Sequence, residues 1–409
     1  MLSTVVQHPI IILPARIKDS ALLWVVLLIT GLNGIAIDLY TPSLPAIATA
    51  LHVSATVAKS SISVGLIGFA VGVLFFGSLS DRWGRRSMIL FGLFVFVIAS
   101  IMGASATNIY VFMASRLLQG AGVATAAMLA RAMLLDHFTG KKLYTAMLYT
   151  STAWGLGPVI APFIGGYLQT SFGWHANFVL YAAYSLALFI LALFFMPETL
   201  ALHKRTRATL LSRFQMVFSN RQFVLFALLS AFCFIQFVLY STAGAFIVEG
   251  QLGLSAITFG HTALLVGFGY FIGTMIGRLL LKTMTLPRVL CLGMGIILLA
   301  NMSLFLMNYL YYMSLWPLVI PIMLVTLGVG IILPIAIASA LEPLRQHAGV
   351  AASMHGFVVM FLGFLLTGWI SQFHIVSIAG IAWLVLAIWV AKAIFMWLGI
   401  RDMAKKNLA

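Results

Sequence analysis

Gly77 to Ile89 reads G-S-L-S-D-R-W-G-R-R-S-M-I and lies between two long apolar runs of the chain. These thirteen residues contain four charges and two glycines. A connection this short joins two antiparallel helices, and Lys and Arg in short loops mark the cytoplasmic side of a membrane protein. We therefore expect Arg82, Arg85 and Arg86 to lie at the cytoplasmic face, between a second and a third membrane span.

The composition places the whole chain in a membrane. It is 63% hydrophobic and 8% charged over 409 residues, which the surface of a water-soluble fold of this length would not tolerate. Its net charge of +15 lies mainly in short connections between apolar runs, so no nucleic-acid partner is expected. Cys233 and Cys291 both lie inside apolar runs, so we expect no disulfide framework, metal site or cofactor. Residues 1–20 lack a short apolar core followed by a cleavage site, so no cleaved signal peptide is expected.

Twelve segments are long enough to cross a bilayer, which takes about 20 apolar residues per helix. Of the 23 Lys and Arg residues, only Lys59 is expected at the outer face and Arg116 within a span. The others, Lys392 included, then fall at the inner face. We therefore expect a protein of the inner cell membrane with both termini in the cytoplasm. The expected spans are 21–48, 57–79, 87–106, 109–135, 144–169, 176–196, 222–248, 257–283, 287–308, 314–341, 346–373 and 377–400.

The spacing of these segments predicts two lobes. A cytoplasmic segment (1–20) precedes a six-helix lobe (21–196), a basic linker (197–221) leads to a second six-helix lobe (222–400), and a short tail (401–409) follows. Two lobes around a central cavity are typical of secondary transporters. The chain has no G-x-x-x-x-G-K-[ST] motif, so transport would be driven by a gradient. A membrane enzyme or channel is the rival reading, but we find no catalytic constellation and no repeated pore loop, and therefore expect no enzyme.

Asp38 is the only one of the eight carboxylates that lies well within an expected span. A carboxylate there costs roughly 2.5 to 3.5 kcal/mol on insertion scales, so it should face water, pair with a cation or carry a proton. A carboxyl group holds its proton more tightly when buried and less tightly beside a cation, which suits proton exchange. The alternative is a structural anchor beside Pro42 and Pro45. Arg116 lies at a similar depth and is the matching cation; it either couples proton and substrate or caps backbone carbonyls.

The fifth expected span combines prolines and glycines, which permit bending and close helix contact. Its residues Gly157, Pro158, Pro162, Gly165 and Gly166 indicate either a flexing gate or tight packing. His355 is a further candidate for proton or substrate contact, because histidine titrates near neutral pH. A wider set of polar, aromatic and Met side chains is expected to line the cavity: Asn33, Tyr40, Gln119, Tyr149, Trp154, Gln236, Tyr240 and Met354.

Three stretches resemble signatures of the major facilitator superfamily. Gly77 to Ile89 is similar to its G-x-L-x-D-R-x-G-R-[RK] loop, Arg116 to Gly122 to its R-x-x-Q-G-x-G motif, and Gly155 to Gly166 to its antiporter motif. Within the superfamily, D-L-Y-T-P-S-L-P from Asp38, A-G-V-A-A-S from Ala348 and P-E-T-L from Pro197 resemble the Bcr/CflA branch of the drug:proton antiporters.

The resemblance implies a monomeric, proton-coupled exporter of drugs or related small amphipathic molecules. Asp38 would exchange protons and substrate, and Arg116 would couple the two. Asp81 would bind the other lobe and so stabilise the outward-open state, as a latch between the lobes, supported by the remaining loop residues Gly77, Arg82, Gly84, Arg85 and Arg86. The alternative is that the loop mainly sets the topology of the chain in the membrane.

The chain departs from the family pattern at several cavity and loop positions. Val73 stands where the family usually has Gln, Phe76 where it has Tyr, and His175 where it has Arg. These differences motivate a second hypothesis, a dedicated carrier of one compound such as a siderophore, nucleoside or other metabolite, in export or uptake.

Overall fold

The computed structural model describes residues 19–138, 140–200, 210–311, 314–372 and 378–408. Within these ranges the chain is helical, with no strand, which confirms the predicted all-α fold. The first half contains α1 (Asp19–Ile35), η1 (Thr41–Ser43), α2 (Leu44–Ala50), α3 (Ala55–Trp83), α4 (Arg85–Ala104), α5 (Ile109–His137), α6 (Gly140–Phe172) and α7 (His175–Phe195). The second half contains α8 (Leu210–Phe218), α9 (Arg221–Ala245), η3 (Phe246–Gln251), α10 (Ala256–Leu280), α11 (Leu286–Tyr311), α12 (Leu315–Leu341), η4 (Glu342–His347), α13 (Ala348–Ser371) and α14 (Ile378–Leu408).

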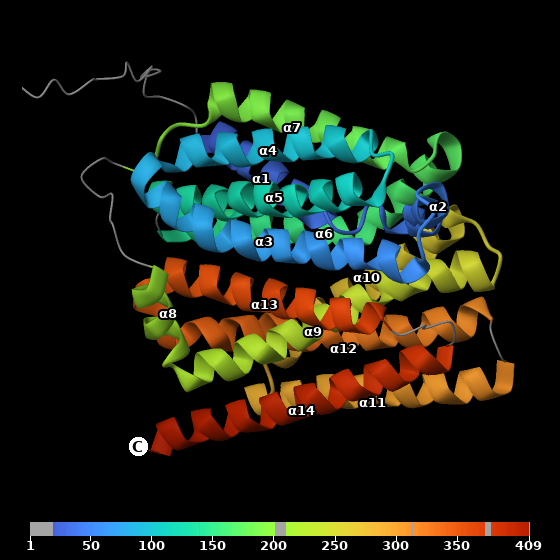
Figure 1. The fold of residues 1–409 in the computed structure, drawn as a ribbon. Helices are drawn as coiled ribbons and strands as arrows, with labels where there is room; N and C mark the ends of the chain where they lie inside the picture. The colour runs from blue at the N-terminus through green and yellow to red at the C-terminus, as the bar shows by residue number, and fades with distance from the viewer. Residues whose placement is uncertain (1–18, 139, 201–209, 312–313, 373–377, 409) are drawn as a thin grey trace, which may run out of the picture.

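The helices form two lobes, α1–α7 and α9–α14, which lie one above the other in Figure 1. The second lobe has its own buried apolar core, and the core of the first lobe extends to a few residues of α9 and α13. α3 of the first lobe runs beside α13 of the second, where the hydroxyl groups of Ser63 and Thr367 are 2.9 Å apart. The long predicted linker contains one element that was not expected, the helix α8; residues 201–209 and 1–18 lie outside the described ranges.

The helices expose large apolar side chains on their outer surfaces. Trp24, Phe194 and Leu299 are each more than 60% exposed. Patches of this kind are unfavourable in water and natural against lipid. Among the described residues, ten helices are long and apolar enough to cross a membrane, and the apolar helix Ser20–Ile35 is shorter. The predicted count of twelve spans remains a prediction.

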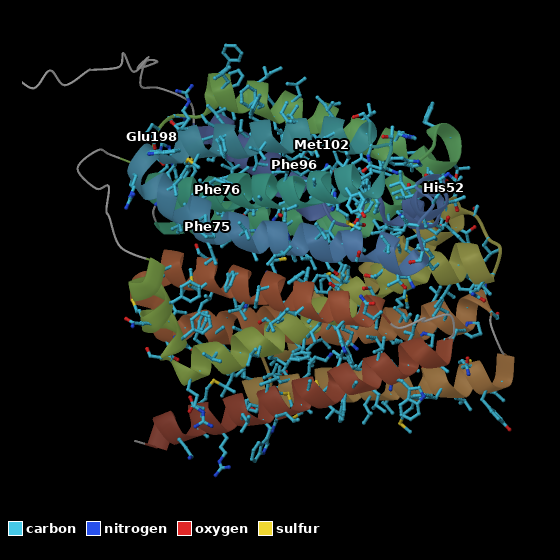
Figure 2. All side chains as sticks on the ribbon, in the orientation of Figure 1. His52, Phe75, Phe76, Phe96, Met102 and Glu198 are labelled. Carbon is cyan, nitrogen blue, oxygen red and sulfur yellow. The ribbon has the colours of Figure 1, made fainter. Side chains whose placement is uncertain are left out.

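The bundle has two distinct ends. Figure 2 places His52 and Glu198 at opposite ends. The α2 end contains η1, α2 and η3. The basic end contains the α3–α4 turn with Arg82, Arg85 and Arg86, and Figure 1 places the C-terminus there.

The first expected span, 21–48, is broken rather than continuous. α1 ends at Ile35, residues 36–40 form a turn, and η1 and α2 follow. Pro42 and Pro45 lack the N–H that an uninterrupted helix needs, and each sits in the first turn of its own short helix, where that loss is tolerated. Asp38 therefore lies in the turn and not inside a regular helix.

Lys392 corrects the expected charge distribution. It lies in the middle of α14 and is fully buried, not at the inner face. Its Nζ donates a hydrogen bond to Oε1 of Gln236 on α9, while Nε2 of Gln236 finds no acceptor among the described residues. The expected span 377–400 already contained Lys392, but a Lys that lies eight residues from the inner end of a span can still extend its long side chain toward the membrane surface. The sequence alone therefore did not reveal that this Lys is buried.

We expect the hydrogen bond between Lys392 and Gln236 to contribute to the stability of the second lobe. Gln236→Leu removes the acceptor of a buried amine and should lower the free energy of unfolding by roughly 1 to 3 kcal/mol. Adding Lys392→Met to Gln236→Leu removes both polar groups and should restore most of that loss. Thermal unfolding of the wild type, both single variants and the double variant in detergent gives the coupling. Additive effects of the two substitutions would contradict the pairing.

Candidate functional site

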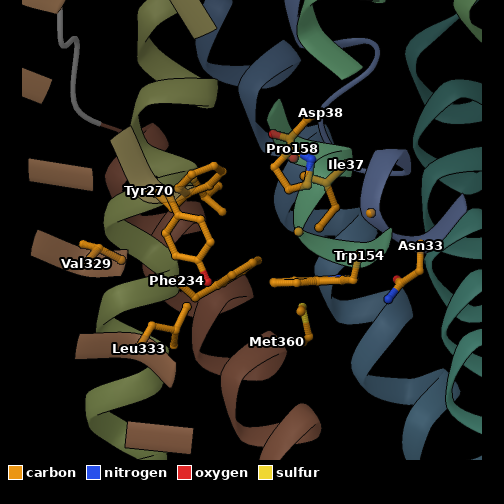
Figure 3. Close-up of a pocket in the computed structure, with 14 residues that line it drawn as sticks. Asn33, Ile37, Asp38, Trp154, Pro158, Phe234, Tyr270, Val329, Leu333 and Met360 are labelled. Carbon is orange, nitrogen blue, oxygen red and sulfur yellow. The ribbon is translucent and has the colours of Figure 1, made fainter. Parts of the chain in front are cut away.

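A hollow with an empty volume of about 610 Å³ lies between the two lobes. Figure 3 shows Trp154 of the first lobe facing Phe234 and Tyr270 of the second. Its walls are largely apolar, and among the described residues Asp38 is the one carboxylate that lines it. The lining residues are Asn33, Gly34, Ile37, Asp38, Trp154, Gly155, Pro158, Phe234, Phe237, Val238, Tyr270, Val329, Leu333 and Met360.

Asp38 joins the two lobes. Its side chain is 4% exposed, and Oδ1 accepts a hydrogen bond of 2.8 Å from Oγ of Ser241 on α9. Broken helices of this kind form binding sites in transporters, because the turn brings polar groups to a cavity at membrane depth. Asp38 therefore combines a proton-binding group with a contact that must change when the lobes separate at this point.

Arg116 supports the broken end of α1. Its Nη2 donates to the carbonyl oxygen of Ala36 at 3.1 Å, its Nη1 donates to Oε1 of Gln119, and its guanidinium lies 4.2 Å from the centre of the Tyr40 ring. Tyr181 donates from its hydroxyl to the carbonyl oxygens of Ile35 and Ala36, at 3.0 Å each. These contacts satisfy carbonyl groups that the end of a helix leaves free.

Arg116 and Asp38 do not form an ion pair in the described part of the chain. They were expected to meet across one cavity, but Asp38 bonds Ser241 of the other lobe, while Arg116 bonds groups of its own lobe. The sequence left a second role open for Arg116, the capping of backbone carbonyl groups, and its hydrogen bond to the carbonyl oxygen of Ala36 is a contact of that kind.

The glycines and prolines of α6 lie at close helix contacts. Pro158 lines the hollow, and a methyl group at Gly157 or Gly165 would overlap the backbone of Gly34 or Leu39. These two contacts are within the first lobe.

Two further α6 residues face the second lobe. A methyl group at Gly166 would lie 2.5 Å from the carbonyl oxygen of Ala256 on α10. In the same way, a methyl group at Gly260 on α10 would lie 2.8 Å from the carbonyl oxygen of Pro162 on α6. Tyr167 also approaches His261 across the lobes, with its hydroxyl 3.4 Å from Nε2. Tight packing is thus the visible role of this part of α6, and it occurs where the lobes touch.

The other candidates are divided between the hollows and the lobe interiors. Asn33 and Trp154 line the main hollow, and Gln119 lines a second hollow beside Arg116. The remaining candidates line neither of these two hollows. Most of them are buried against other parts of the chain: Tyr40 bonds Ser61, Tyr240 bonds Thr262, Gln236 bonds Lys392, and Met354 and His355 are buried in α13. Tyr149 is instead 54% exposed on the surface of α6. Nε2 of His355 has no hydrogen-bond partner among the described residues.

Several residues at the hollow were missed by the sequence reading. Phe234, Phe237, Val238 and Ser241 share one face of α9, and three of them line the hollow while Ser241 bonds Asp38. Their spacing of three and four residues is the helical period, but lipid-facing residues show the same period. The described residues contain no cluster of His, Cys, Asp or Glu that could hold a metal ion.

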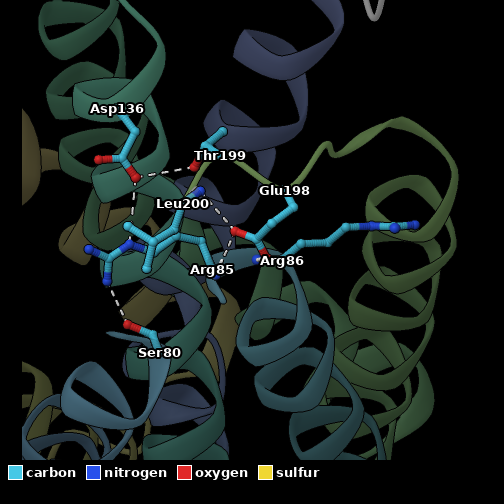
Figure 4. A network of polar contacts seen from close by, with 7 residues as sticks. All are labelled: Ser80, Arg85, Arg86, Asp136, Glu198, Thr199 and Leu200. Atoms are coloured by element: carbon cyan, nitrogen blue, oxygen red, sulfur yellow. Dashed lines mark hydrogen bonds and ion pairs between the residues drawn. The ribbon is translucent and has the colours of Figure 1, made fainter. Parts of the chain in front are cut away.

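A polar network holds the basic end of the first lobe together. Figure 4 shows Glu198 at the start of α4, where its Oε1 accepts from the backbone N–H of Arg85 at 3.0 Å and its Oε2 from that of Arg86 at 3.3 Å. Arg85 also reaches Oδ2 of Asp136 at 3.6 Å and Oγ of Ser80 at 2.6 Å. These are first-lobe contacts; the side chain of Asp81 lies outside the described part, so its expected role as an inter-lobe latch remains a prediction.

The network predicts a cost for losing Glu198. Gly84, the residue before α4, has no side chain to cap the helix, so the Glu198 carboxylate supplies the acceptors. Glu198→Ala should lower the stability of the first lobe by roughly 0.5 to 2 kcal/mol, as loss of an N-cap does. Glu198→Gln keeps an acceptor oxygen and should lose less. Thermal unfolding in detergent measures both, and equal stability of Glu198→Ala and wild type would contradict the cap.

Comparisons with known proteins agree with this geometry. The family model described as Major Facilitator Superfamily matches residues 26–367. Multidrug resistance protein D of Escherichia coli is 26% identical over 344 residues, covering 83% of this chain and 86% of that protein. A bicyclomycin resistance protein homolog of Haemophilus influenzae is 28% identical over 333 residues, covering 80% and 83%. The solved structure of the xylose transporter XylE from E. coli, in a partially occluded inward open conformation, aligns with a TM-score of 0.72 at 14% identity, covering 92% of this chain and 97% of that one.

Proposed function

Because the chain belongs to the Major Facilitator Superfamily, we propose that it exports drugs and related small amphipathic molecules across the membrane in exchange for protons. The names of its relatives, a multidrug resistance protein and a bicyclomycin resistance protein homolog, support this substrate class. A mainly apolar, aromatic hollow suits amphipathic compounds, since such side chains bind varied ligands by shape and desolvation.

The observation that carries the proposal is the position of Asp38. It is the carboxylate that lines the hollow, it is 4% exposed, and its hydrogen-bond partner Ser241 belongs to the other lobe. A buried carboxylate binds a proton readily and releases it when water or a cation approaches. Proton binding at Asp38 would therefore alter both the charge seen by the substrate and a contact between the lobes.

We place the basic end in the cytoplasm, because the arginines of the α3–α4 turn lie there and Lys and Arg favour that side. The inter-lobe contacts of Asp38 with Ser241, of Tyr167 with His261 and of Gly166 with Ala256 then lie toward the outer side. The protein would cycle by loading substrate at the hollow from the cytoplasm, separating these outer contacts, and exchanging substrate for a proton at Asp38.

The exposed apolar surfaces of the helices suit direct contact with lipid, in the inner membrane of a bacterial cell. Each protomer would carry a complete hollow between its own two lobes, so a monomer would suffice for transport.

The test is a resistance profile. A bacterium that lacks its own efflux pumps is given the protein, and growth is measured against a panel of unrelated amphipathic antibiotics. Accumulation of the same antibiotics in the cells is then measured with and without a protonophore. We expect protection against several of them, together with a lowered accumulation that the protonophore abolishes. Response to a single compound class would favour the dedicated carrier, and no protection together with no accumulation change would contradict export.

A further inference from the structure

A second hollow, with an empty volume of about 280 Å³, lies inside the first lobe beside Arg116. α1, α3 and α5 form its walls, with Gly65 and Phe69 on α3 and Val123 on α5. It shares Asn33 and Ile37 with the main hollow. Asn33 on α1 and Ile37 in the turn after it therefore border both spaces.

Arg116 has hydrogen-bonding capacity left over at this hollow. A guanidinium group has five N–H donors. The described contacts use one on Nη1, to Gln119, and one on Nη2, to Ala36, and the Tyr40 hydroxyl is a further hydrogen-bond partner of the guanidinium. Its Nε is buried and has no acceptor among the described residues, and the residue as a whole is only 2% exposed. Buried donors are nearly always paired with protein groups or ordered water, so an unpaired one beside an empty space points to an acceptor that enters this space. A ligand oxygen that bonds Arg116 there would take the place of a water molecule.

The surroundings hold the guanidinium in place. Gln119 accepts from Arg116 with Oε1 and donates from Nε2 to Oγ of Ser100 at 2.8 Å, so its orientation is determined. The Tyr40 ring covers one face of the guanidinium. The nearby carboxylate of Asp38 is bonded to Ser241 and does not neutralise Arg116. Arg116 is thus a positioned, water-poor donor group without a counter-charge among the described residues.

We propose that the second hollow is a subsite for a hydrogen-bond acceptor of the substrate, such as a ketone, amide, nitro or carboxylate group. The aromatic or apolar body of the compound would remain in the main hollow, between Trp154 and Tyr270, and its acceptor would pass Asn33 and Ile37 to reach Arg116. This inference rests on the proposed export of amphipathic molecules and adds a selection rule to it. Compounds that carry an acceptor at one end of an aromatic body are preferred over the same bodies without it, because charge-assisted hydrogen bonds in a dry site discriminate strongly.

The test uses two probes that differ by one group. 4-Acetylbenzylamine and 4-ethylbenzylamine have the same aromatic amine, and the carbonyl of the first replaces a methylene of the second. Isothermal titration of each into the purified protein in nanodiscs, with no pH gradient, gives the ratio of their dissociation constants. We expect the wild type to bind the acetyl compound roughly 10- to 100-fold more tightly, the range typical of a hydrogen bond to a charged group.

Two variants fill the second hollow and leave Arg116 and Asp38 unchanged. Val123→Leu adds bulk from α5, and Gly65→Ala places a methyl group 3.3 Å from Nη2 of Arg116. Each should bring the ratio close to one while the affinity for the ethyl compound stays within about twofold, since that compound does not use the subsite. Val329→Leu, which adds the same bulk to the main hollow, is the matched control and should weaken both compounds alike.

Three results would overturn the proposal: a ratio near one in the wild type, a ratio that persists in both filled variants, or no binding of either compound to the wild type. The outcome is separate from the proposed function, because equilibrium binding needs no proton gradient. A clear preference without any proton-coupled flux would keep the subsite and reject the antiport.

Discussion

The Asp38→Asn variant is expected to lose all proton-driven transport while it remains folded. Asparagine has nearly the same shape, and its amide oxygen can still accept the hydrogen bond from Ser241, so the contact between the lobes is retained. What the variant loses is the ability to bind and release a proton in the hollow. Substrate should still bind, and exchange of labelled for unlabelled substrate at equal pH should continue.

The measurement compares proteoliposomes that contain wild-type protein, Asp38→Asn or Asp402→Asn. Asp402 lies near the end of α14, paired with Arg221 at 4.0 Å, and serves as the matched loss of a carboxylate outside the hollow. An imposed pH gradient should drive substrate movement in the wild type and in Asp402→Asn, and only background movement in Asp38→Asn. Undiminished gradient-driven transport in Asp38→Asn would remove Asp38 from the mechanism.

Gly166→Val should hold the lobes apart at the α2 end. A methyl group at this position already lies 2.5 Å from the carbonyl oxygen and 3.1 Å from the carbonyl carbon of Ala256, and both are backbone atoms that cannot turn away. Overpacking of this kind costs about 1 to 3 kcal/mol. A cost of about 3 kcal/mol on one of two conformations changes their ratio about 150-fold. A population that is evenly divided between the two would then lie almost entirely in the other conformation.

Spin labels at Ala50 and Leu254, exposed positions in the two lobes near the α2 end, report this change, after Cys291 is replaced by Ser. Pulsed distance measurements on Gly166→Val should give a longer mean distance than the wild type and slower transport. Gly250→Ala is the matched control, because a methyl group there meets nothing within 4 Å. An unchanged distance distribution in Gly166→Val would mean that this contact does not oppose opening.

The charged connections predicted the helical layout well, and for a physical reason. The stretch around Gly77 to Ile89 cannot be buried in lipid, so its charges mark where α3 ends and α4 begins, and the structure has that boundary at Gly84. The break at Ile35 was harder to predict. Pro42 and Pro45 lie several residues beyond it, and a kink or a complete turn are both compatible with prolines at those positions.

The candidate site could be predicted only in part. Asp38 and Arg116 are noticeable because charges are rare inside apolar segments. Ser241 and Tyr270 could not be found in this way, since nothing in an apolar helix distinguishes the face toward the other lobe from the face toward lipid. Gln236 shows the opposite error: its polarity indicated a place in the cavity, but it faces α14 and binds Lys392.

We propose that substrate and protons cross the membrane in opposite directions and that Asp38 carries the proton. A recording of both movements in the same wild-type proteoliposomes tests this exchange, with a pH-sensitive dye inside and a labelled antibiotic that the resistance profile has identified. We expect each addition of the antibiotic on one side to move protons the other way in a fixed ratio, and we expect Asp38→Asn to stop both movements. Antibiotic movement without proton movement, or movement of both in the same direction, would contradict it.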